Sequence, residues 1–194
     1  MKNIGFALLL LAYLSNCQKN NLPIPGTPVD PVDTSIVVVD TALLPLGQGA
    51  VLKNGVAWNA PFEAWYYHSD SVFQIRAEIV HSNLLGEHFF IIDIPCKKKK
   101  YSLEYHTIAN NRNLVPESFF AMSQDYDQGI GDFYVDTTRL DNYLEVLHYD
   151  STEQTAEGRF QVFMKKRYSD NPWPGVPDSI YLTEGKFHLK IKKP

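Results

Sequence analysis

The chain has 194 residues, of which 44% are hydrophobic and 13% aromatic, and its formal net charge is −4. These proportions favour a globular fold over a disordered chain. The acidic balance gives no reason to expect nucleic acid as a partner.

Residues 1–16 have the features of a secretory signal. Lys2 supplies a positive charge, and an apolar stretch runs from Ile4 to Leu14. A membrane-spanning helix needs about 20 apolar residues, so this shorter run is typical of a signal peptide. The L-S-N-C sequence ending at Cys17 resembles the lipobox of bacterial lipoproteins. The resemblance implies cleavage before Cys17, a lipid on its thiol and attachment to a membrane. The alternative is a buried N-terminal helix with an incidental cysteine.

Residues 17–47 are expected to form the lipidated N-terminus and an extended spacer. The stretch 18–35 is rich in proline and has almost nothing to bury, which favours a solvated, polyproline-like chain. In that conformation it would reach on the order of 55 Å. No acidic residue follows Cys17 directly, and by resemblance to Gram-negative lipoproteins this implies the outer membrane, facing the periplasm.

The remainder, 48–194, alternates between apolar and polar residues as strands do. In the stretch 158–168, Phe160, Val162 and Met164 alternate with polar residues, and 72–80 and 185–193 repeat the pattern. Further strands are expected at 49–53, 61–68, 87–94, 101–106, 117–124, 131–137 and 143–149. Many short strands separated by turns predict a single all-β, antiparallel domain, either a β-sandwich or barrel-like.

A β-bulge is expected at Gly185. Ile180 and Leu182 place the apolar face on even positions, whereas Phe187 and Leu189 place it on odd positions. One strand keeps both sets on the same side only if an extra residue shifts the register, and glycine readily adopts the left-handed conformation that this requires.

Two further segments carry a second resemblance. The sequence NGVAWNA at 54–60 and the paired ending TAEGRFQVFMKK…PDSIYLTEGKFHLKI at 155–191 resemble a family of uncharacterised bacterial lipoproteins. The resemblance implies an all-β domain of unknown function and nothing about a ligand.

No motif for nucleophilic catalysis, phosphate binding or zinc binding is present, and we expect no cofactor. Asp125, Asp127 and Asp132 surround a glycine-rich turn and could supply oxygen ligands to calcium. We favour a solvated hairpin in which Gly129 and Gly131 have positive φ. A cross-strand histidine pair, His81 with His88, is conceivable as a metal site, although strand-end histidines are the ordinary explanation.

Exposed aromatic rings can stack on sugars, but strands also prefer aromatics for packing. We expect Trp58 and Trp65 in the core and Trp173 exposed and available to a ligand. If the thiol of Cys17 carries a lipid, Cys96 has no cysteine left to pair with, and it is expected at a half-buried strand end. The neighbouring run Lys97–Lys100 is expected to be a solvated turn.

Two functions fit these features. The preferred one is an envelope-anchored lipoprotein with a non-enzymatic β-domain that binds a ligand or protein partner, in contact with the membrane through the lipid on Cys17. The alternative is an envelope hydrolase-like enzyme with carboxylates from separate strands. Two convergent carboxylates in one cleft would favour the enzyme.

Overall fold

A computed structural model describes residues 44–67, 69–105, 115–125, 128–167 and 173–193. The described residues belong to one compact unit. Residues 1–16, which the sequence predicts to be a signal peptide, lie outside the described residues, as do Cys17 and the proline-rich stretch 18–35. Within the described residues, no helix is long and apolar enough to cross a membrane.

The described residues contain strands and no helix, which confirms the all-β prediction. The strands are β1 Gln48–Lys53, β2 Val56–Ala57, β3 Phe62–Tyr67, β4 Ser69–Val80, β5 Leu85–Pro95, β6 Lys99–Ser102, β7 Glu117–Gln124, β8 Gln128–Val135, β9 Tyr143–Asp150, β10 Thr155–Lys166 and β11 Ser179–Lys192.

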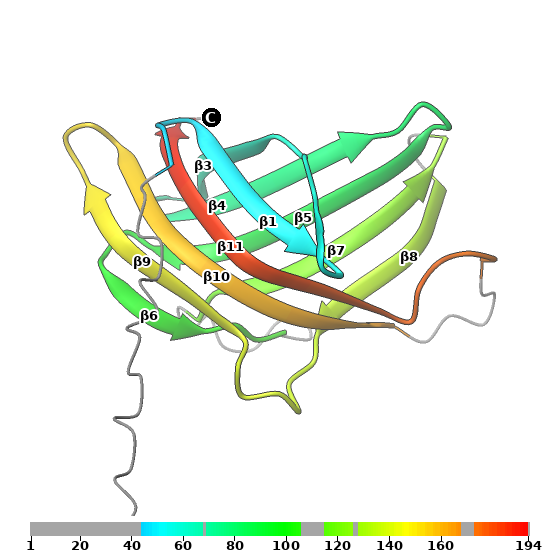
Figure 1. Cartoon of the computed structure of the whole chain (residues 1–194). Coiled ribbons are helices and arrows are strands. Elements are labelled where there is room, and N and C mark those ends of the chain that lie inside the picture. The colour runs from blue at the N-terminus through cyan, green and yellow to red at the C-terminus, as the bar shows by residue number, and fades with distance from the viewer. Residues whose placement is uncertain (1–43, 68, 106–114, 126–127, 168–172, 194) are drawn as a thin grey trace, which may run out of the picture. The chain divides into compact units, whose positions relative to one another are not determined.

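The strands form one mostly antiparallel sheet that closes on itself. The order is β2-β1-β11-β3-β4-β5-β7-β8-β10-β9-β6, and β10 also pairs with β11, which joins distant parts of this order. Two short junctions complete the closure: β11 pairs in parallel with β3, and β10 pairs with the end of β8. Figure 1 shows β1, β11, β10 and β9 as one layer, with β3, β4, β5 and β7 running across behind it. The domain is therefore barrel-like.

Alternation of side chains explains why these segments pair in this way. In β10, Phe160, Val162 and Met164 are buried, while the residues between them are half-buried or exposed. The other long strands follow the same rule, and their inward side chains form one continuous hydrophobic core. Phenylalanine dominates it: the fully buried rings are Phe73, Phe89, Phe120, Phe133, Phe160 and Phe187. Burial of these rings is the main favourable term in closing the sheet.

The predicted bulge in β11 is present. Phe160 faces Gly185 and Val162 faces Leu182, so β11 has one more residue than β10 between these pairs. The pairing of β1 with β11 shifts at the same place. The residue with positive φ is Glu184, at 54°, and not Gly185 as expected. Glycine at 185 has a packing role instead: a Cβ there would stand 2.6 Å from carbon atoms of the Phe160 ring.

Three other details differ from expectation. The short strand β2 was not predicted, because its two residues are too few to show alternation. Asp125, at the start of the turn between β7 and β8, has positive φ, while Gly129 and Gly131 lie inside β8 without positive φ. The expected turn at Lys97–Lys100 is exposed, but its second half belongs to β6. Lysines on this edge strand discourage pairing with another chain.

Candidate functional site

The β1–β2 hairpin is built on an Asn-Gly turn. Asn54 has a φ of 51° and Gly55 a φ of 80°, as a type I′ turn requires. The Asn54 backbone N–H donates to the Tyr181 carbonyl at 2.8 Å, and the Tyr181 N–H donates to the Asn54 side-chain oxygen at 2.8 Å. These two bonds fix the tip of the hairpin to β11.

The flanks of the hairpin converge on one buried carboxylate, that of Glu87 on β5. The Trp58 indole N–H donates to Glu87 Oε2 at 2.6 Å, and the Lys53 ammonium forms an ion pair with Oε1. His81 Nε2 lies 3.6 Å from Oε2. The Glu87 side chain is only 6% exposed, so these partners replace the water that a carboxylate otherwise needs. The cluster ties β1, β2 and β5 together.

Glu87 and Lys53 were not predicted from the sequence to be site residues. The alternation in β5 does indicate Glu87: it occupies an odd-numbered position, as Phe89 and Ile91 do, and those side chains point into the core. A charged residue at an inward position calls for a partner. Lys53 likewise follows Val51 on the inward face of β1.

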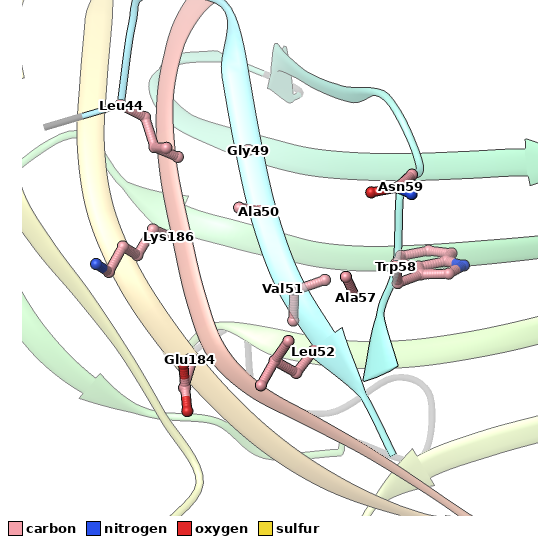
Figure 2. A pocket seen from close by; sticks show the side chains of 10 residues that line it. All are labelled: Leu44, Gly49, Ala50, Val51, Leu52, Ala57, Trp58, Asn59, Glu184 and Lys186. Atoms are coloured by element: carbon pink, nitrogen blue, oxygen red, sulfur yellow. The ribbon is translucent and has the colours of Figure 1, made fainter. Parts of the chain in front are cut away.

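A groove of about 290 Å³ lies over the outer face of β1. The small side chain of Ala50 forms part of its floor, and Figure 2 shows the segment from Ala57 to Asn59 along one side. Glu184 and Lys186 of β11 lie on the other side, so the groove combines an apolar floor with charged groups. The remaining lining residues are Leu44, Val51, Leu52 and Trp58. A concave, mostly apolar surface with a few polar groups is the usual form of a ligand site.

A second hollow, of about 170 Å³, is lined by Pro61, Glu63, Arg76 and Glu78. The two carboxylates come from β3 and β4, as the enzyme hypothesis required. They converge on a cation, however: Arg76 lies 3.4 Å from Glu63 and 3.4 Å from Glu78. Lys192 also bonds Glu63 at 2.8 Å, and this hydrogen bond is the main reason that the pKa of Glu63 is lowered. Both carboxylates therefore form ion pairs with the same arginine.

The calcium hypothesis receives no support from the described residues. Asp125 lies at the turn after β7, whereas Asp132 lies within β8 opposite Ala121, several residues from the turn. Asp127 lies outside the described residues. In the part of the chain that the structure describes, no cluster of three or more metal-ligating side chains is present.

The conceivable histidine pair does not form. His81 is next to Glu87, as described above. His88 contacts Glu78 through Nδ1 at 3.2 Å and Ser123 through Nε2 at 3.1 Å. Each histidine thus has its own partners on neighbouring strands.

The aromatic and cysteine predictions are partly correct. Trp58 is buried as expected, and Trp173 is exposed, at 37% of its surface. Trp173 does not line the groove over β1. Trp65 was wrongly placed in the core: it is half-buried on the outer face, where the Lys192 ammonium lies 4.9 Å from its ring centre. Cys96 directly follows β5 and is half-buried, as predicted.

Comparison with known proteins identifies no relative: no protein-family model, curated protein or solved structure matches this chain.

Proposed function

We propose that the chain is an envelope-anchored lipoprotein whose β-domain binds a ligand or protein partner without catalysing a reaction. The lipid on Cys17 would hold it in a membrane. The expected location is the outer membrane, with the protein facing the periplasm. The groove over β1 is the observation that supports binding. It is open, its floor is apolar, and the Glu184 and Lys186 side chains offer polar contacts at its side.

The hairpin gives this groove a rigid wall. Trp58 lines the groove and also donates to the buried carboxylate of Glu87, so its ring has a fixed position. A wall that is already in place lowers the entropy lost when a ligand binds.

The alternative is an envelope hydrolase-like enzyme. The convergence of Glu63 and Glu78 in one hollow favours it, but Arg76 forms an ion pair with each of them and the pKa of Glu63 is lowered, chiefly by the hydrogen bond from Lys192. A pair of carboxylates that works as acid and base needs one member protonated. We therefore prefer binding.

The anchor is tested by replacing Cys17→Ala and labelling the native host with a radioactive fatty acid. Wild-type protein should take up the label and fractionate with membranes, whereas the variant should not be labelled. Cys96→Ala is the matched control and should behave as wild type. Absence of label from the wild-type chain would refute the lipoprotein assignment.

The groove is tested with the apolar fluorescent anion anilinonaphthalene sulfonate. Ala50→Glu places a longer, negatively charged side chain on the groove floor, where it repels the sulfonate, and should weaken binding about tenfold, corresponding to about 1.4 kcal/mol. Ser102→Glu, at an exposed position of β6 that does not line the groove, is the control. Equal binding by both variants would show that the dye does not use the groove.

A further inference from the structure

A serine, a histidine and a glutamate form a chain of two hydrogen bonds on the outer face of the sheet. Ser123 Oγ lies 3.1 Å from His88 Nε2, and His88 Nδ1 lies 3.2 Å from Glu78 Oε1. A nucleophile in contact with a base, which a third group orients, is the diagnostic arrangement for nucleophilic catalysis. It is independent of the groove over β1, since none of the three residues lines that groove.

Strand register brings the three side chains together. Glu78 on β4 is directly opposite His88 on β5. Ser123 on β7 is opposite Gly86, two residues from His88 along β5. On β7, Phe120 and Met122 point into the core. By alternation along the strand, Ser123 points outward, as His88 does on β5.

Two glycines flank the serine on its neighbouring strands. A Cβ on Gly86 would stand 2.7 Å from His88 Nε2 and would collide with Ser123 Oγ, so the contact between serine and histidine depends on glycine at this position. On the other side Ser123 pairs with Gly129, where an added Cβ would meet nothing within 4 Å. Ser123 exposes only 9% of its surface.

We propose that Ser123 is the nucleophile of an acyl-transfer site that acts on esters, with His88 as general base. This activity uses a site separate from the groove over β1, and it would replace the non-enzymatic part of the function proposed above while leaving binding in the groove unaffected. Ser123 Oγ attacks the ester carbonyl carbon while its proton moves to His88 Nε2. The bond from that carbon to the alcohol oxygen then breaks, and the leaving alcohol takes the proton from His88. Water releases the acyl group by the same steps and restores the serine.

Glu78 is a positioning residue in this scheme. It accepts a hydrogen bond from His88 Nδ1 and so leaves Nε2 free to accept the serine proton. Arg76, 3.4 Å from the other Glu78 oxygen, holds the carboxylate in place. Val80 lies opposite Gly86 and is 47% exposed, so it offers an apolar contact to an acyl group on the same row as Ser123.

The test is covalent labelling of the full chain with a fluorophosphonate, which reacts with an activated serine by loss of fluoride. The wild type should gain one adduct, and peptide mapping should place it on Ser123. His88→Gln should slow labelling by at least about 100-fold, the usual contribution of a general base. Ser102→Ala removes an exposed serine from β6 and should leave labelling unchanged.

Hydrolysis of p-nitrophenyl acetate tests the positioning role. Glu78→Gln should lower kcat and leave KM unchanged, with a melting temperature close to that of the wild type. A wild-type chain that takes no label, or takes it on another serine, overturns the proposal. So does a folded His88→Gln variant that labels at the wild-type rate. The labelling of the wild type tests the proposal by itself, so the proposal can be refuted even if a variant fails to fold.

Discussion

The indole N–H of Trp58 donates to the buried carboxylate of Glu87 at 2.6 Å, across the interior of the closed sheet. The two residues lie far apart in the sequence, one just after the β1–β2 hairpin and the other on β5. Lys53, on the other flank of the hairpin, contacts the same carboxylate. One acidic group therefore holds both flanks of the hairpin and, through Trp58, one wall of the groove.

Replacement of Glu87 by glutamine should destabilise the domain strongly. Removing one partner of a fully buried ion pair costs about 3–5 kcal/mol, and we expect about 2–3 kcal/mol here because Lys53 is near enough to the surface to regain water. Urea unfolding measures the difference. Glu63→Gln is the control: its ion pairs lie on the surface, where each contributes about 1 kcal/mol or less. Equal losses for the two variants would contradict the role of Glu87.

Gly185→Ala should cost about 1–3 kcal/mol by overpacking, because the new methyl group would press on the Phe160 ring. Gly129→Ala is the matched control, since a Cβ there meets nothing within 4 Å and φ is not positive. It should be neutral or stabilise by up to about 1 kcal/mol, through the lower backbone entropy of alanine in the unfolded chain. The comparison uses chemical unfolding. A Gly185→Ala variant as stable as Gly129→Ala would show that the core accommodates the methyl group.

Gly55→Ala tests the hairpin turn separately from packing. The space around Gly55 is open, but its φ of 80° is unfavourable for any residue with a Cβ. We expect a loss of about 1–2 kcal/mol from this conformation alone. Because the hairpin carries Lys53 and Trp58, dye binding in the groove should weaken as well. Unchanged stability would mean that the turn relaxes to another type.

The stability of the domain should fall in acid, with Asp136 as one contributor. Hydrogen bonds from Thr138, and next the Lys165 ammonium 2.9 Å away, lower the pKa of Asp136. Because the folded pKa lies below the unfolded value of about 3.9, the stabilisation is complete above that pH. It is lost as the pH falls through the folded pKa. Melting temperatures from about pH 6 to about pH 2 should therefore decline less steeply in Asp136→Asn than in the wild type. Parallel curves would exclude Asp136 as a contributor.

Alternation in the sequence was sufficient to predict most strands. Segments such as 72–80 and 117–124 coincide with β4 and β7 to within a few residues, because one face of each must be buried and the other solvated. The change of parity between Leu182 and Phe187 even located the bulge in β11. The parity change did not identify Glu184 as the residue with positive φ, because glycine is the usual residue in that conformation. Here Gly185 is required instead for close packing against the Phe160 ring.

The contacts that define the candidate sites depend on pairing between strands that are distant in the chain. Local pattern predicts that Glu87 points inward and His88 outward, but not that Trp58 meets the first or that Ser123 meets the second. Those meetings require β5 to lie between β4 and β7 in a particular register, and the closure of β10 on β11. Sequence alone thus determined the class of fold and the alternation of faces, because both follow from burial of apolar side chains along each strand. Only the tertiary structure decided which polar groups share a face within hydrogen-bonding distance, because register between strands is set by the packing of the whole core.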